Sequence, residues 1–200
     1  PHSLKILTCC NNNITHLDNL PIGLQTLSCQ GNNIQQLDNL PPNLDYLNCS
    51  NNKITHLDNL PLSLTNLQCV DNMIHELNNL PNTIRILCCS NNNIEELNNL
   101  PLNIIILICM KNNLTHLDNL SKSIHLESLY CGYNSITRLE HLPSELTTLQ
   151  CHNNKITQLD KLPTTLKNLG CQFNNLISLN YLPDHLEILD CTYNPIKEIK

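Results

Sequence analysis

Cysteine is the residue whose spacing first suggests chemistry in this chain. Ten of the twelve cysteines recur at intervals of 20 residues, or once of 22, at Cys9, Cys29, Cys49, Cys69, Cys89, Cys109, Cys131, Cys151, Cys171 and Cys191. On neighbouring parallel strands their Cβ atoms would stay about 4.8 Å apart, whereas a disulfide needs about 3.8 Å and converging bonds. We therefore predict a column of small, buried free thiols, which favours an intracellular, reducing compartment.

The other two cysteines, Cys10 and Cys88, fall outside this column and should point away from the core. A catalytic thiol needs a base within reach, and the residues expected beside Cys88 on the neighbouring strands are Gln68 and Ile108. The sequence also lacks a Gly-rich phosphate loop, an HExxH motif, a CxxC pair and an EF-hand loop. We therefore expect no enzymatic activity and no cofactor.

Acidic side chains that recur at another repeat position are the one candidate for metal chemistry. They are Asp18, Asp38, Asp58, Asp118, Glu140 and Asp160. Stacked carboxylates about 5 Å apart could hold Ca²⁺ between turns of the chain. Asparagine replaces the acid in three other repeats, which suits an Asx-type turn better than a charged site. We predict the turn role and no bound metal, and we keep calcium as the alternative.

A 20-residue repeat that runs through the whole chain must position all these residues. Its pattern is Pro-x-x-Leu-x-x-Leu-x-Cys-x-x-Asn-x-Ile-x-x-Leu-x-x-Leu, as in the segment 41–60, where Pro41 is position 1, the cysteine position 9 and the asparagine position 12. Ten copies, here called coils 1 to 10, fill residues 1–200. An unbroken period of this length predicts a single elongated array, and hence one domain.

Each coil contains one short segment with the alternation of a β-strand. This segment is Leu-x-x-Leu-x-Cys, whose second half alternates between inward and outward positions. The recurring proline and a return path of only about eight residues leave no room for an α-helix. We predict a solenoid with a parallel sheet on its concave face. The convex face should consist of extended, polyproline-like or 3₁₀ return segments.

The invariant asparagine after each strand has a predicted structural role. The column is Asn12, Asn32, Asn52, Asn72, Asn92, Asn112, Asn134, Asn154, Asn174 and Asn194. Where the chain turns inward, backbone N–H and C=O groups would be buried without partners. An inward carboxamide supplies two donors and an acceptor, so we expect it to bridge adjacent coils.

These motifs carry a resemblance to leucine-rich repeat proteins. Leu44-x-x-Leu47-x-Cys49-x-x-Asn52-x-Ile54 is similar to the LxxLxLxxNxL signature, with cysteine in place of the third leucine. The short repeat and the Leu-Pro at each boundary resemble bacterial effectors of the YopM and IpaH type, and the composition resembles the Cys- and Asn-rich repeat proteins of giant viruses. The resemblance implies a curved solenoid that binds partners through exposed strand residues, and a host cytoplasmic location for an effector or viral protein.

One coil departs from the pattern. Between Leu120 and Cys131 the repeat is two residues longer than elsewhere, and Ser121 stands in place of the proline. We predict a local bulge near the strand entry at about 121–131, within one domain, because the core pattern resumes in phase at Leu126.

Bulk composition limits the class of partner. Only 14% of the residues are charged and the net charge is −6, so no basic surface is expected for nucleic acid or anionic lipid. No apolar run approaches the ~20 residues that a membrane helix needs. The chain starts in phase with the repeat and without methionine, which suggests an excerpt of a longer protein. We expect a monomer.

The outward strand positions predict a partner-binding surface on the concave face. Coils 1 to 3 place small or polar residues there, such as Thr8 and Asn51, whereas later coils carry apolar and then aromatic residues. The candidate binding residues are Ile86, Cys88, Ile106, Ile108, Met110, Tyr130, Tyr133, His152, Phe173 and Tyr193. The simpler explanation is that isoleucine and tyrosine favour strands. Against it, these positions alternate away from the leucine core.

Three functions are compatible with this pattern. The first is a non-catalytic module that binds a protein or peptide on the concave sheet. The second is the substrate-recognition part of a larger effector enzyme of the ubiquitin-ligase type. The third is a structural spacer without a specific ligand.

Overall fold

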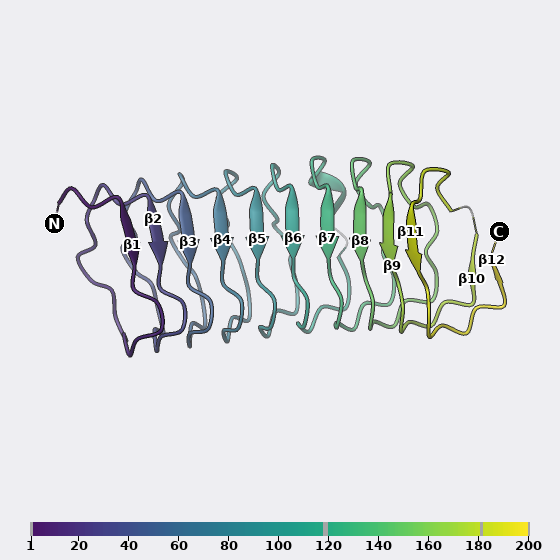
Figure 1. The fold of residues 1–200 in the computed structure, drawn as a ribbon, viewed down its shortest axis with the longest axis horizontal. Helices are drawn as coiled ribbons and strands as arrows, with labels where there is room; N and C mark the ends of the chain where they lie inside the picture. Colours follow the sequence, from purple (N-terminus) through teal and green to yellow (C-terminus); the bar gives the residue numbers. More distant parts are fainter. Residues whose placement is uncertain (1, 118–119, 181, 200) are drawn as a thin grey trace.

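The computed structural model describes residues 2–117, 120–180 and 182–199. It is a parallel β-solenoid in which each coil contributes one three-residue strand to a ten-stranded sheet of order β1 to β9 followed by β11 (Figure 1). The strands are β1 (Ile6–Thr8), β2 (Thr26–Ser28), β3 (Tyr46–Asn48), β4 (Asn66–Gln68), β5 (Ile86–Cys88), β6 (Ile106–Ile108), β7 (Ser128–Tyr130), β8 (Thr148–Gln150), β9 (Asn168–Gly170) and β11 (Ile188–Asp190). The predicted fold class is confirmed.

The strands are short because only their middle residue faces the core. In β2 to β8 the central leucine is buried while its two neighbours are half-buried on the outer side. Neighbouring strands pair without a shift, as Leu87 with Leu107, so equivalent side chains stack in columns through the molecule. Burial of each leucine contributes about 1.5–3 kcal/mol, and this stabilisation comes from contact with adjacent coils.

In coils 2 to 6 and 8 to 10 the proline begins a tight turn that leads into the strand. Its carbonyl accepts a hydrogen bond from the backbone N–H three residues later, as between Leu24 N–H and Pro21 O at 3.0 Å. The return segments after the strand are largely irregular, as the proline spacing predicts. At the C-terminal end two of them pair as β10 (Ser178–Leu179) and β12 (Glu198–Ile199) in a separate two-stranded sheet (Figure 1).

The longer coil is accommodated by a 3₁₀ turn, η1 (Leu120–Lys122), at the entry to β7. After it, the Ser123 carbonyl accepts from Leu126 N–H at 3.0 Å, which is the bond that proline makes in the other coils. Ser123 therefore occupies the proline position, and the prediction that Ser121 does so is wrong by two residues. The extra residues lie within η1, before the turn that Ser123 begins, and Leu126 is fully buried.

Each coil contains backbone positions with left-handed φ. One column lies at position 11, two residues after the cysteine, with φ between 52° and 55° at non-glycine residues and 70° at Gly31. A second column lies at position 19 and includes Asn19, Asn39, Asn59 and Asn79. Asparagine and glycine tolerate this conformation best, so these turns explain why asparagine suits both positions.

Candidate partner-binding surface

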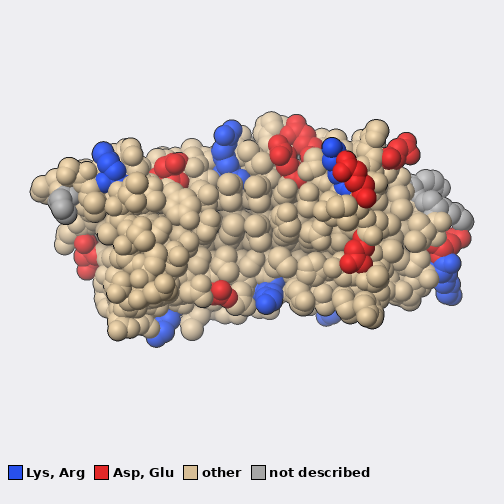
Figure 2. Space-filling view, viewed as in Figure 1, with Lys and Arg blue, Asp and Glu red and all other residues tan. Residues whose placement is uncertain are grey.

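The outward side chains of the sheet form one surface, here called the strand face. They come from positions 6 and 8 of each coil, in the strand, and from positions 10 and 11, the two residues after the buried cysteine. Figure 2 views the molecule from this side and shows a broad uncharged band, with most charged side chains towards its margins. Such a surface offers apolar and polar contacts but no strong electrostatic field.

An apolar patch lies at the centre of the strand face. The register places Ile86 beside Ile106 and Cys88 beside Ile108, and Met110 follows β6. These five side chains are half-buried, whereas the sequence suggested an exposed patch. They are covered in part because neighbouring outward side chains on adjacent strands lie against one another. Tyr130 pairs with Ile108 on one side and Gln150 on the other, and so extends this patch towards coil 8.

An aromatic row follows the apolar patch along the edge where the strands end. Tyr133, Phe173 and Tyr193 are 48%, 46% and 75% exposed. The Phe173 and Tyr193 rings stack with centroids 4.3 Å apart and an interplanar angle of 8°. The Tyr133 ring meets His152 edge-on at 5.1 Å. These contacts hold the rings in fixed orientations although they face solvent.

All three aromatic residues have left-handed backbone conformations. Their φ values are 54° at Tyr133, 55° at Phe173 and 54° at Tyr193. A bulky side chain is unusual in this region, which costs an L-residue roughly 1–2 kcal/mol. Other coils place Asn, Gly, Asp or, at Lys111, Lys at this position. The fold thus tolerates aromatic rings at a position where packing does not require them, which is typical of functional sites.

Two glycines leave room for side chains that lie across the strand face. A Cβ atom at Gly132 would come 2.6 Å from the His152 ring, and one at Gly170 would come 2.0 Å from Gln150 Oε1. His152 therefore leans towards coil 7, while Gln150 leans towards coil 9. Sequence reasoning identified His152 but not Gln150, Gly170 or Lys111, whose Nζ lies 5.8 Å from the Tyr133 ring centroid. These three residues join the candidate site through contacts between adjacent coils, which the repeat pattern does not show.

The asparagine column lies behind this surface and connects the coils. The Asn92 Nδ2 group donates to the carbonyl oxygens of Cys69, Cys89 and Ser90 at 2.9–3.1 Å. Equivalent bonds link each coil from coil 2 onwards to the coil before it, so the carboxamides span the junctions between coils. The hydrogen bonds of this column join backbone groups of adjacent coils, as expected for a structural role.

All twelve cysteines are free thiols. Burial raises the pKa of Cys29, Cys131 and Cys171 to about 12, with smaller contributions from neighbouring thiols at Cys29 and Cys171. Burial also raises the pKa of Cys88, which lies between Gln68 and Ile108 in the sheet. A thiol that ionises less readily than usual is a poor nucleophile, so the cysteines here pack and do not suggest catalysis.

The acidic column on the opposite, convex side makes side-chain pairs within its own coil. Gln36 Nε2 donates to Asp38 Oδ2 at 3.0 Å, and Arg138 lies 3.7 Å from Glu140. At Asp38 and Glu140 these contacts are to side chains and are not the predicted bonds to backbone N–H groups. Among the described residues no three His, Cys, Asp or Glu side chains gather in a metal-binding arrangement. Asp118, a member of the candidate calcium group, lies outside the described residues.

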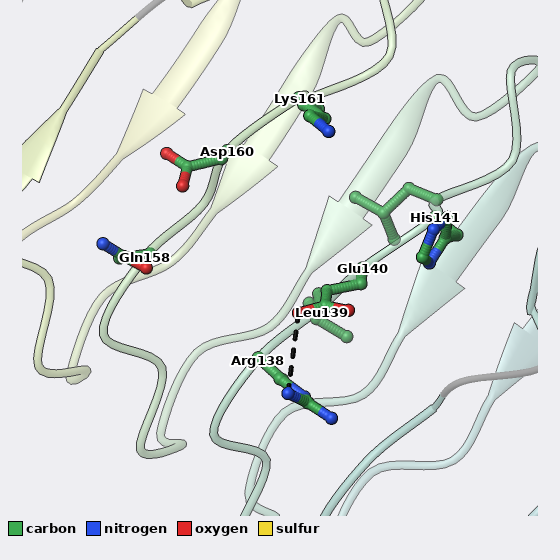
Figure 3. A pocket seen from close by; sticks show the side chains of 8 residues that line it. Arg138, Leu139, Glu140, His141, Gln158, Asp160 and Lys161 are labelled. Carbon is green, nitrogen blue, oxygen red and sulfur yellow. Dashed lines mark ion pairs between the residues drawn. The ribbon is translucent and has the colours of Figure 1, made fainter.

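A hollow of about 360 Å³ lies between the return segments of coils 7 and 8. Figure 3 shows Arg138, Glu140 and His141 along one segment, and Asp160 and Lys161 on the next. The charged side chains that line it are all exposed and of both signs. They do not converge on one point, so this hollow is a weaker candidate site than the strand face.

Comparison with known proteins agrees with this architecture. A family model described as Leucine Rich repeats (2 copies) matches residues 124–164. YopM from Yersinia enterocolitica WA-314 is 31% identical over 100% of this chain and 53% of that chain, with a TM-score of 0.75. YopM from Yersinia pestis, described as a leucine-rich effector protein, is 28% identical over 94% of this chain and 60% of that chain, with a TM-score of 0.81.

A third solved structure is similar along almost the whole chain. The functional domain of InlJ from Listeria monocytogenes, described as including a cysteine ladder, is 28% identical over 99% of this chain and 53% of that chain, with a TM-score of 0.84. This chain thus spans between about half and three-fifths of the length of these three structures. No curated protein sequence matches it.

The fold and these likenesses define the chain as a leucine-rich repeat protein. Within that class its short coils resemble the leucine-rich repeats of bacterial effectors. In the described part of the chain, no helix has the length and apolar character needed to cross a membrane.

Proposed function

We propose that the protein is a non-catalytic recognition module that binds a protein segment along the strand face of coils 5 to 10. The observation that carries this proposal is the exposed aromatic row at left-handed backbone positions. Tyrosine is among the residues that dominate interface energies. Backbone strain at an exposed position indicates selection for something other than stability.

The apolar patch and the aromatic row fit one extended ligand. From coil 5 to coil 10 the strand spacing gives about 24 Å, which is the length of about seven extended residues. A segment of this size would bury Ile108 and Tyr130 near one end and contact Phe173 and Tyr193 near the other. The low charge of the strand face argues against a nucleic-acid partner, because phosphate binding needs basic side chains.

The test is a selection of dodecapeptides from a random display library on the immobilised chain. We expect the selected peptides to bind Ile108→Asp and Tyr133→Asn variants more weakly by about 1–2 kcal/mol. A Thr8→Ala variant, changed in the polar early coils, should bind them as the unmodified chain does. Asparagine is chosen at position 133 because other coils carry it at the same backbone conformation, so the variant should fold.

Either of two results would overturn the proposal. If no peptide is enriched, or if the enriched peptides lose binding in Thr8→Ala and retain it in the other two variants, the strand face of coils 5 to 10 is not the binding surface. The isoleucines and tyrosines would then reflect strand propensity, and the protein would be better described as a spacer.

The likeness to YopM favours a second candidate, in which this array is the recognition part of a larger effector. In either case we propose a monomer in a reducing, intracellular compartment, where free thiols persist. An effector would meet this condition in the host cytoplasm. Thiol titration of protein isolated without reductant tests the compartment, and full recovery of twelve thiols is the expected result.

A further inference from the structure

We propose that an arginine side chain of the partner is the anchor of this interaction, and that it binds between Gln150 and Asp190 at the C-terminal end of the strand face. This inference rests on the proposed function and specifies its ligand chemistry. The site is formed by Gln150, Asp190 and the stacked pair Phe173 and Tyr193.

Gly170 lies between two residues whose side chains can accept hydrogen bonds, and it is buried beneath one of them, Gln150. It pairs in register with Gln150 on one side and with Asp190 on the other. Gln150 lies across Gly170, because its Oε1 atom is 2.0 Å from the place where a Cβ would stand. The Gln150 Nε2 group donates to Asn168 Oδ1 at 2.9 Å, which fixes the amide and leaves Oε1 directed over Gly170 as an acceptor.

Asp190 supplies the charge on the other side of Gly170. Its Oδ1 atom accepts from the backbone N–H of Thr192 at 3.1 Å and from the Thr192 hydroxyl at 2.8 Å. Both bonds fix the carboxylate and use the same oxygen, so Oδ2 remains an acceptor for a ligand. Asp190 is the one charged residue at the outward strand-face positions of coils 7 to 10. This end of the face therefore favours a cation.

The stacked rings belong to the same two coils as Gly170 and Asp190. Phe173 follows β9 and Tyr193 follows β11, the two strands that carry Gly170 and Asp190. Their parallel rings expose aromatic surface to solvent, and a cation is attracted to the face of such a ring.

Arginine fits this combination better than lysine does. The planar guanidinium carries five donors in a fixed fork and stacks on aromatic rings, so it can bond the Gln150 and Asp190 oxygens and lie against the rings together. A lysine ammonium satisfies the charge alone. A neutral or acidic side chain would leave the carboxylate without a partner.

The experiment compares three Gly/Ser peptides that each carry two copies of arginine, lysine or citrulline, the neutral isostere of arginine. Binding to the full ¹⁵N-labelled chain is followed by NMR. We expect saturable shifts at Gly170, Asp190 and Tyr193 with the arginine peptide, and at least tenfold weaker binding of citrulline. Asp190→Asn should weaken arginine binding at least fivefold, whereas Asp184→Asn, an exposed acid of the same coil but off the strand face, should not.

Equal binding of the arginine and citrulline peptides, or equal effects of the two aspartate variants, overturns the inference. The display selection separates this failure from that of the proposed function. Peptides that depend on the strand face but lack arginine would overturn the arginine anchor alone, whereas selection of no such peptide would overturn the proposed function itself.

Discussion

The backbone N–H of Ile74 donates a hydrogen bond to the Asn92 Oδ1 atom of the next coil at 2.9 Å. Ile74 is fully buried and Asn92 is 7% exposed, so water cannot replace this partner. The same carboxamide donates to carbonyl oxygens of both coils. One side chain therefore satisfies backbone groups on each side of the junction, and each junction depends on its own asparagine.

Replacing Asn92 by alanine should lower the free energy of unfolding by about 1–3 kcal/mol, because it leaves Ile74 N–H buried without a partner and removes one of the two donors at the Cys69, Cys89 and Ser90 carbonyl oxygens. The neighbouring Asn93 side chain is exposed, and its backbone N–H, which donates to Ile74 O at 2.9 Å, survives the substitution. Asn93→Ala should therefore cost less than about 0.5 kcal/mol. Urea unfolding measures both, and equal losses would contradict the assigned role.

The left-handed conformation at Phe173 predicts an unusual order of stability among variants at this position. Asparagine accepts this conformation better than alanine does, and both replacements remove the stack with Tyr193. Phe173→Asn should therefore be more stable than Phe173→Ala by about 1 kcal/mol. Thermal unfolding of the pair gives the comparison. Equal stability of the two variants would show that the backbone conformation at this position costs nothing.

The buried thiols predict a loss of stability at alkaline pH. The pKa of Cys131 is about 12 in the folded protein because of its burial, against an ordinary value near 9. Between these values the unfolded chain binds fewer protons than the folded one. The stabilisation is therefore complete below about pH 9 and decreases by about 1.4 kcal/mol per pH unit for each such thiol as the pH rises towards 12.

Urea unfolding in reductant at pH 8.5, 9.5 and 10.5 measures this slope. Cys131→Ala removes one thiol, so its slope should be shallower by about 1.4 kcal/mol per pH unit. The packing loss in this variant does not depend on pH and does not affect the slope. Parallel pH profiles for the two proteins would be inconsistent with a raised pKa at Cys131.

We expect the replacement of Ser123 by alanine to stabilise the protein. Its side chain is fully buried and its Oγ atom has no hydrogen-bond partner among the described residues. Ser123→Ala should therefore raise the free energy of unfolding by about 1 kcal/mol, because it removes an unsatisfied polar group. The control is Ser63→Ala, since Ser63 Oγ donates to Leu44 O at 2.7 Å and its loss should be destabilising. Destabilisation by both changes would indicate that the Ser123 hydroxyl is satisfied.

The sequence by itself determined the coil, the sheet order and the inward columns. In a solenoid each residue lies beside its equivalent one repeat away, as Leu87 beside Leu107, so the period in the sequence is also the contact map. The same period predicts that Ile86 lies next to Ile106 on the strand face. Inward and outward positions follow directly from the alternation of a three-residue strand.

Only the tertiary structure decided the backbone conformation in the turns and the direction of the side chains that lean towards a neighbouring coil. The left-handed φ of Tyr133 is set by the turn after the cysteine. Asparagine, glycine and aspartate in other coils are compatible with this conformation, but no invariant glycine marks the position. Ser123 takes the place of proline because the 3₁₀ turn absorbs the extra residues before it. Gln150 reaches across Gly170 because the space there is set by the neighbouring coil. These features depend on side-chain volumes in adjacent coils and on local dihedral angles, which differ between coils that share one sequence pattern.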